Sequence, residues 1–161
     1  MTNNLEIIQS KIFSLENLIP ALNVWKFKEK KIVFTNGCFD VLHRGHIEYL
    51  AKAANLGNKL VIGLNTDESV RENKGKNRPV QDEYSRALIL ASLKFVDAVV
   101  LFNEKTPENL IKLVKPDFLV KGGDYAIENI VGSAFVSSYG GQVIVIEYLE
   151  NHSSSSIINK I

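Results

Sequence analysis

The 161-residue sequence contains a single cysteine, Cys38, so the chain cannot form an internal disulfide, a usage typical of a reducing compartment. No apolar run approaches membrane-spanning length, and the first residues, MTNNLEIIQSK, lack the apolar core of a secretory signal. The formal net charge is only +1, which gives no reason to expect a nucleic-acid or membrane surface. We therefore expect a cytoplasmic protein whose partners include neither nucleic acid nor membrane.

Two common nucleotide-binding motifs are also missing. Without G-x-G-x-x-G a nicotinamide or flavin site is not supported, and without the P-loop pattern a Walker-type kinase is disfavoured. The composition, 45% apolar and 23% charged, is ordinary for a soluble globular protein of one domain. We find no repeat, linker or second domain, and divide the chain into a helical extension at 1–28 and a main domain at 29–161.

The most informative stretch is KIVFTNGCFDVLHRGHIEYL at residues 31–50. It is typical of a buried strand, a tight turn and the first turns of a helix. His43 and His46 lie three residues apart on one face of that helix start, and Gly45 leaves the backbone between them open. Because unpaired N–H groups and the helix dipole favour an anion there, the stretch predicts a triphosphate site.

Two other chemical roles for this stretch are weaker. The histidine pair could be part of a zinc site, but no cysteine or acidic residue stands at a matching spacing. We therefore expect no metal held by the protein itself. Cys38 has no base partner in the sequence, so we expect a packed small residue and not a nucleophile.

Five short apolar runs predict five strands, and their positions are 32–34, 58–64, 96–102, 118–120 and 143–146. Helical patterns alternate with them. This order predicts an α/β fold with a Rossmann-like, doubly wound, five-stranded parallel sheet and right-handed crossovers. Ligands in such sheets bind beyond the carboxyl ends of the strands.

Capping residues mark the expected helices. Residues 4–28 suggest two amphipathic helical pieces, the second capped by Ser14 and bent or interrupted by Pro20. We expect this region to pack on the main domain or on a second subunit. Asp82 can cap a helix that ends near residue 94, and another helix should follow Pro107. The apolar residues within 153–161 indicate a docked closing helix and not a flexible tail.

The polar run SVRENKGKNR at 69–78 has two interpretations: a solvated loop, or a mobile basic lid over phosphates. Gly122 and Gly123 follow a predicted strand and allow positive φ and close ligand approach. Together with 35–46 and 153–156, these motifs fall at strand ends or helix starts. That coincidence indicates a single site.

Four motifs carry a resemblance that spans roughly residues 14–161: TNGCFDVLHRGH, KGKNRPV, KPDFLVKGGDY and SSSSIINKI. The first resembles the H-x-G-H motif of the nucleotidyltransferase superfamily, which includes the cytidylyltransferases and pantetheine-phosphate adenylyltransferase. The other three make the chain most similar to the heptose 1-phosphate adenylyltransferases of ADP-heptose synthesis. One departure is visible, since the family's glycine before the last hydroxyl run is replaced here by Asn151.

The resemblance implies an enzyme that transfers AMP from ATP to D-glycero-β-D-manno-heptose 1-phosphate, giving ADP-heptose and pyrophosphate for lipopolysaccharide core synthesis. It also implies Mg²⁺ bound through the ATP phosphates, a separate sugar kinase that supplies the acceptor, and a homodimer. The alternative enzyme is a cytidylyltransferase acting on glycerol 3-phosphate or a similar small alcohol phosphate, because the residues do not fix the base. A non-catalytic nucleotide-sensing module is disfavoured by the intact histidine pair and Lys74.

Site roles follow from the same resemblance. The catalytic residues would be His43, His46 and Lys74. Nucleotide contacts are assigned to Thr35, Asn36, Gly37, Phe39, Arg86, Gly122, Gly123, Asp124, Ser153, Ser154 and Ser155. Acceptor contacts are assigned to Asp40, Asn65, Arg78 and Lys121. Two of these have a second interpretation: Asp40 could instead support the motif loop, and Arg86 could be a surface charge.

Overall fold

The computed structural model describes residues 3–147 and 154–158. Within them, six parallel strands form one sheet in the order β1-β4-β3-β2-β5-β6. The strands are β1 Ile12–Phe13, β2 Ile32–Gly37, β3 Lys59–Asn65, β4 Ala98–Phe102, β5 Phe118–Gly122 and β6 Gln142–Ile146. The chain winds outward from β2 to β4 and then crosses to β5 and β6, so the predicted doubly wound parallel sheet is confirmed.

The predicted number of strands was wrong by one. All five expected strands are present, but Ile12, assigned above to a helical piece, begins a sixth strand at the sheet edge. This strand pairs with β4 through Ile12 with Val99 and Phe13 with Val100. Two residues are too short for a period-two pattern, and the pairing partner lies far away in sequence. No local signal could have revealed β1.

The helices begin at the expected caps, but one expected helix interruption is absent. Their bounds are α1 Asn4–Gln9, α2 Leu15–Phe27, α3 Arg44–Ala54, α4 Asp67–Lys74, α5 Glu83–Ser92, α6 Glu108–Val114, α7 Ser133–Ser138 and α8 Ser154–Ile158, with a 3₁₀ turn η1 Ile127–Asn129. Ser14 and Asp82 cap α2 and α5 as predicted. The interruption expected at Pro20 does not occur, and α2 continues through it. The buried neighbours Leu18 and Leu22 hold the helix on the sheet and offset the lost hydrogen bond.

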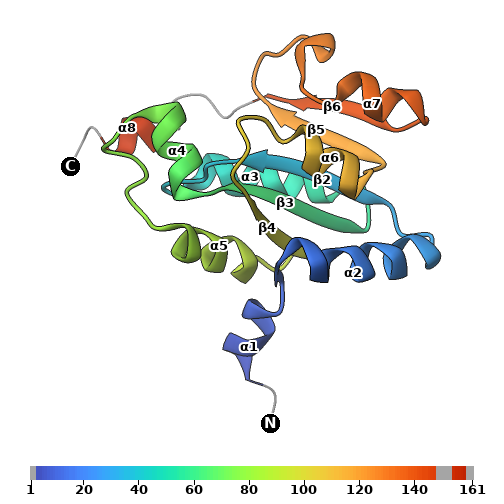
Figure 1. Ribbon diagram of the computed structural model, residues 1–161, viewed down its shortest axis with the longest axis horizontal. Coiled ribbons are helices and arrows are strands. Elements are labelled where there is room, and N and C mark those ends of the chain that lie inside the picture. The colour runs from blue at the N-terminus through green and yellow to red at the C-terminus, as the bar shows by residue number, and fades with distance from the viewer. Residues whose placement is uncertain (1–2, 148–153, 159–161) are drawn as a thin grey trace.

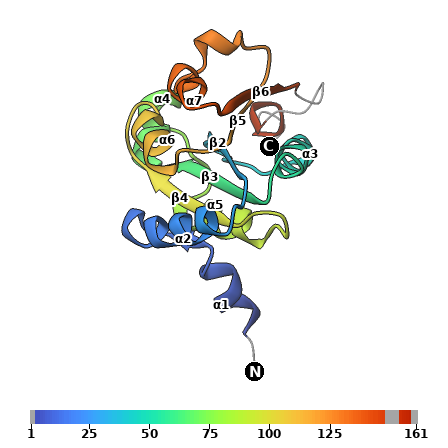
Figure 2. The same cartoon turned by 90° about the vertical axis from the view of Figure 1, so that its right-hand side faces the viewer.

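Helices cover both faces of the sheet (Figures 1 and 2). Figure 2 shows α6 and α7 on one side and α3 on the other. The strands alternate between two cores, so that Phe34 faces the core formed with α2, α6 and α7. Its neighbour Val33 faces the core formed with α3 and α5. This two-sided burial explains why the strands are continuous apolar runs.

The polar run that starts at Ser69 is a helix up to Lys74, so the solvated-loop interpretation was wrong for that part, whereas the basic lid over phosphates stays a prediction. The Thr66 hydroxyl accepts a hydrogen bond from the Ser69 amide and caps α4. Asp67 begins the first turn and Lys74 ends the last, which suits the helix dipole. Helix α4 was not predicted because its sequence has no apolar residues at helical spacing. Its capping residue Thr66 and its charged ends were nevertheless usable signals.

The N-terminal part divides into a packed and a projecting portion. β1 extends the sheet and α2 buries Leu18 and Leu22 against it, so this portion packs on the main domain. Figure 2 shows α1 projecting from the body of the molecule, and Gln9 at its end donates a hydrogen bond to the Tyr84 hydroxyl of α5. The domain boundary at residue 28 and the homodimer stay predictions. Among the described helices, none combines the length and apolar character needed to cross a bilayer.

Replacing Leu18 with alanine should lower the free energy of unfolding by about 2–5 kcal/mol, because this side chain is fully buried between α2 and the sheet. Urea unfolding monitored by circular dichroism measures the change. Phe27→Ala is the matched control in the same helix: its side chain is 89% exposed and its loss should change the free energy little. Equal effects of the two substitutions would contradict the packing of α2.

Candidate active site

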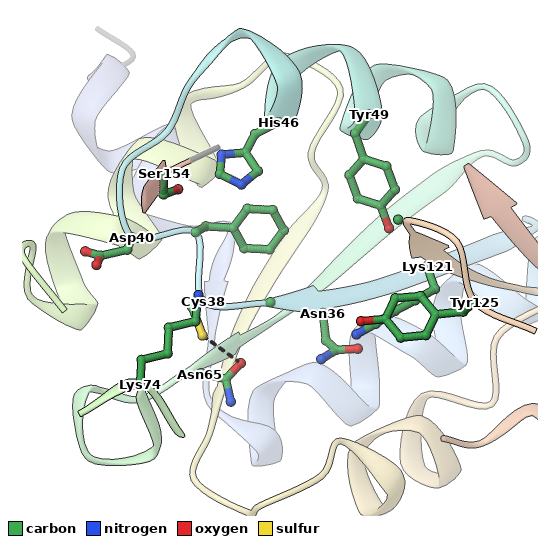
Figure 3. A pocket seen from close by; sticks show the side chains of 13 residues that line it. Asn36, Cys38, Asp40, His46, Tyr49, Asn65, Lys74, Lys121, Tyr125 and Ser154 are labelled. Atoms are coloured by element: carbon green, nitrogen blue, oxygen red, sulfur yellow. Dashed lines mark hydrogen bonds between the residues drawn. The ribbon is translucent and has the colours of Figure 1, made fainter. Parts of the chain in front are cut away.

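A cavity of about 330 Å³ opens where the carboxyl ends of β2 and β5 diverge. This is the point where the strand order reverses, the usual ligand site of a doubly wound sheet. The lining brings together segments far apart in sequence: Asn36, Gly37, Cys38, Phe39, Asp40, His46, Tyr49, Asn65, Lys74, Lys121, Gly122, Tyr125 and Ser154 (Figure 3). Most of the predicted site residues therefore do meet at one place.

The histidine pair forms a stacked corner at the start of α3. His43 is the N-cap residue, and its Nδ1 accepts a hydrogen bond of 3.1 Å from the Gly45 amide. A ring nitrogen that accepts carries no proton, so the neutral ring is protonated at Nε2. The His43 and His46 rings stack with centroids 3.8 Å apart, and only His46 lines the cavity. His43 therefore adjoins the cavity through its partner ring and does not line it, and its predicted catalytic role stays a prediction.

His46 is a neutral imidazole in a cationic environment. Burial, the largest cause, and electrostatic repulsion from His43 and Lys74 together lower its pKa to about 4, although the Val41 carbonyl acts in the opposite direction. Its Nδ1 is buried and has no hydrogen-bond partner among the described residues. An anionic ligand in the cavity would relieve this electrostatic cost.

The loop between β2 and α3 is shaped by Gly37 and Phe39. Phe39 has a φ of 44°, an unusual conformation for a bulky residue, and its side chain is buried. The ring returns over Gly37, where an added Cβ would lie only 3.0 Å from it. Phe39 also meets His46 edge-on, with ring centroids 5.2 Å apart. The glycine, the phenylalanine and the imidazole thus fix one another's positions.

Two lysines enter the cavity from different elements (Figure 3). Lys74 ends α4, and Lys121 lies near the end of β5. Burial lowers the pKa of Lys121, and the nearby Cys38 side chain acts in the opposite direction. Among the described residues the Lys121 ammonium has no ion-pair partner. The two cations and the amino end of α3 make the cavity suited to a polyanion.

Asp40 and Arg78, both predicted to contact the acceptor, are paired with each other. The Asp40 carboxylate accepts hydrogen bonds from the Arg78 Nε at 2.5 Å, the Val80 amide at 2.7 Å and the Gln81 amide at 3.2 Å. Burial alone would raise the pKa of Asp40, but these hydrogen bonds and the Arg78 charge outweigh it and lower the pKa. This geometry favours the alternative in which Asp40 supports the motif loop.

Arg86 is fully buried, so the surface-charge interpretation was wrong. Its guanidinium donates hydrogen bonds to three backbone carbonyls, those of Gln81 at 3.0 Å, Cys38 at 2.7 Å and Asn65 at 2.9 Å. It also donates to the Asp67 carboxylate at 2.7 Å. It does not line the cavity. Arg86 instead connects the segments that follow β2 and β3 to the start of α5.

The remaining predicted residues differ in where they lie relative to the cavity. Thr35 is buried beneath the cavity, where its hydroxyl hydrogen-bonds to that of Tyr49 at 2.7 Å. Gly123 has a φ of 113° and, with the exposed Asp124, lies just past the lining. Ser154 lines the cavity and donates to the Val41 carbonyl. Ser155 is exposed, and Ser153 and Asn151 lie outside the described residues.

Three lining residues had no role in the sequence analysis. Tyr49 stands three residues after His46, so helical spacing could have indicated it. Tyr125 follows the glycine pair, and an aromatic residue there was a usable signal. Cys38 was expected to be a packed residue, and its sulfur lies 3.8 Å from the Asn65 Oδ1. No sequence signal pointed to the thiol as part of the wall.

Comparisons with known proteins agree with this geometry. The Cytidylyltransferase-like family model matches residues 34–160. Among curated relatives, the "Bifunctional protein HldE" of Geobacter metallireducens is 51% identical over 94% of this chain and 31% of that protein. The protein of the same name from Helicobacter hepaticus is 49% identical over 99% of this chain and 32% of that protein. The chain thus spans about a third of the length of these curated relatives.

Two solved structures share the fold. A lipopolysaccharide core biosynthesis protein from Thermoplasma volcanium has a TM-score of 0.62 and 30% identity, over 76% of this chain and 99% of that one. A pantoate-beta-alanine ligase from Francisella tularensis, complexed with beta-gamma ATP and beta-alanine, also has a TM-score of 0.62. It covers 92% of this chain and 76% of that one at 21% identity, a likeness of fold alone.

We predict that lowering the pH from 6.5 to 4 destabilises the protein partly through His46. An unfolded histidine takes up a proton near pH 6.5, whereas the folded His46 does so only near pH 4. The unfolded state therefore binds more protons in this window, and the free energy of unfolding falls as the pH falls. Allowing for partial exposure, the loss is on the order of 2 kcal/mol.

Chemical denaturation at several pH values measures this loss in the wild type and in His46→Gln, which should lack this component. An NMR titration of the imidazole protons reads the pKa directly. A His46 that titrates near 6.5 in the folded protein would contradict the prediction.

Proposed function

The chain belongs to the cytidylyltransferase-like family, and from that premise we propose that it is a nucleotidyltransferase that moves AMP from ATP to heptose 1-phosphate. The observation that carries this proposal is the meeting of a neutral His46, the amino end of α3 and two lysines in one cavity at the strand-order reversal. This arrangement is suited to a polyphosphate. Relatives close to 50% identical over nearly the whole chain support the same assignment.

In this reaction an oxygen of the sugar phosphate attacks the α-phosphorus of ATP. A new P–O bond forms, the bond from the α-phosphorus to the bridging oxygen breaks, and pyrophosphate leaves with the electron pair. The nucleophile is already anionic, so no general base is required. The protein has to position the two anions and stabilise the charge that moves onto the leaving group.

The cavity offers residues for each of these tasks. His46 would hydrogen-bond the triphosphate, and a polyanion would raise the imidazole pKa from about 4 so that it can share a proton. Lys74, exposed at the end of α4, would meet the β- and γ-phosphates. Lys121, on the other side of the cavity, would hold the acceptor phosphate against the α-phosphorus. Each cation counters the repulsion between the two substrates.

We also propose that Mg²⁺ reaches the site on the ATP phosphates, where it offsets their charge. Its preferred ligands are hard oxygens, and phosphate oxygens with water supply them. The described residues contain no group of three or more histidine, cysteine or acidic side chains that could hold a metal ion. The one carboxylate in the lining, Asp40, is engaged by Arg78 and two backbone amides. The donor set therefore fits an ion carried mainly by the nucleotide.

The proposal also specifies the nucleotide as ATP and the acceptor as heptose 1-phosphate. They rest on the resemblance of residues 115–125 to the heptose enzymes, and the Thermoplasma volcanium neighbour is itself described as a lipopolysaccharide core biosynthesis protein. A sugar kinase reaction must supply the phosphorylated acceptor. The curated relatives are named bifunctional, and their extra length leaves room for another activity. Because ATP is the donor, we propose a cytoplasmic location. The resemblance to the heptose enzymes also leads us to propose a homodimer.

We predict that the purified protein releases pyrophosphate when it is given ATP and heptose 1-phosphate. Each nucleoside triphosphate should be tested with heptose 1-phosphate and with glycerol 3-phosphate, and the release measured by a coupled colorimetric assay. Removal of divalent ions with EDTA should abolish turnover, and Mg²⁺ should restore it. Turnover with CTP and glycerol 3-phosphate only would contradict the assignment and favour the cytidylyltransferase alternative.

Replacing Lys74 with alanine should lower kcat/KM for ATP by roughly 100-fold, because the substitution removes a cation that would face the phosphates. His46→Ala should have an effect of similar size. The matched control is Lys52→Ala, another exposed lysine, which lies in the last turn of α3 and does not line the cavity. Steady-state kinetics at several ATP concentrations distinguish the variants. A Lys74→Ala enzyme with the kinetics of Lys52→Ala would contradict the assigned role.

A further inference from the structure

A second cavity of about 220 Å³ adjoins the first. The two share one wall, formed by Asn36, Lys121 and Tyr125. Figure 3 shows these three side chains grouped on the side of the first cavity away from His46 and Ser154. A ligand that reaches past this wall extends away from the cationic corner and into the second cavity.

The second cavity has its own chemistry. Its floor is apolar and includes Leu119 and Pro107, whereas Asn36 and Asn129 add two amide side chains. An amide group can both donate to and accept from a hydroxyl, and an apolar wall suits the C–H face of a sugar ring. The combination therefore fits a polyhydroxylated ligand better than a second polyanion.

Lys121 belongs to both cavities, and this decides how a substrate would lie. Its half-buried ammonium has no ion-pair partner among the described residues and marks the boundary as the place for an anionic group. A phosphate bound there would be able to face the first cavity with one oxygen and the second with its organic part, because Lys121 lines both. Gly122, assigned above to the nucleotide, lines the first cavity and not the second, which leaves the second available for the acceptor.

From these contacts we propose that the second cavity is the acceptor subsite and that Asn129 is a specificity residue that recognises sugar hydroxyls. The inference rests on the proposed nucleotidyltransferase function and adds to it the place of the acceptor. Asn129 ends the 3₁₀ turn η1, in the segment between β5 and α7, and does not line the first cavity. Its substitution can therefore alter acceptor choice and leave the polyphosphate site intact.

The test is a kinetic comparison of Asn129→Ala with wild type. In the variant, KM for heptose 1-phosphate should rise by about tenfold, because the loss of one hydrogen bond weakens binding by about that factor. KM for ATP should not change. If glycerol 3-phosphate is turned over at all, its KM should be the same in the variant and the wild type, because this acceptor lacks the sugar hydroxyls. Glu128→Ala is the matched control, since Glu128 is the exposed neighbour of Asn129 and is absent from both linings.

A second variant blocks the subsite by volume. Val131 lines the second cavity and is 39% exposed, so Val131→Trp can fill the entrance without burial of a large side chain in the core. It should abolish turnover of heptose 1-phosphate while calorimetry shows unchanged ATP binding. Circular dichroism confirms folding, and Asn129→Ala tests the assignment independently if the tryptophan variant is unstable.

The outcomes separate the two proposals. An active wild type whose variants change KM for ATP, or change neither KM, overturns the acceptor subsite and leaves the nucleotidyltransferase function standing. A wild type that binds ATP but does not turn over heptose 1-phosphate overturns the proposed function, and the subsite assignment fails with it.

Discussion

The buried guanidinium of Arg86 is the interaction on which the geometry of the site depends. Its hydrogen bonds reach the carbonyl after β2, the carbonyl at the end of β3 and a carboxylate at the start of α4. Asp40 adds a second buried connection by holding the backbone at Val80 and Gln81. Three loops from different parts of the chain are thereby fixed to one another, and loss of either hub would leave buried polar groups unpaired.

This framework holds a site that is electrostatically unfavourable without a ligand. His46 is kept neutral, its buried Nδ1 has no hydrogen-bond partner within the described part of the chain, and burial lowers the pKa of Lys121. Stacking against His43 and edge contact with Phe39 prevent the imidazole from turning toward solvent. Groups held this way are ready for an anion before it arrives, and binding energy is not spent on arranging them.

The sequence predicted the parts of this fold that depend on local signals. Strand runs such as 32–34 and caps such as Ser14 and Asp82 are encoded within a few residues, and they were confirmed. Neighbouring motifs also indicated the common cavity, because parallel strands end at the same edge of a sheet. β1 was missed because its partner β4 lies more than eighty residues away, and α4 because a polar helix has no apolar period. The role of Arg86 depends on backbone carbonyls, which leave no trace in residue types.

The division of the site into two cavities suggests how one fold can serve different acceptors. The pantoate-beta-alanine ligase shares the fold at 21% identity, so the sheet alone cannot specify the substrate. Under the proposed function, the polyphosphate would be handled by the rigid turn between β2 and α3, which Gly37, Phe39 and Arg86 hold in place. The acceptor would instead meet the segment 123–131, which is mostly exposed, and exposed loop residues can vary at little cost in stability. Acceptor choice could then change through residues such as Asn129 while Lys121, at the shared wall, keeps the two substrates in register.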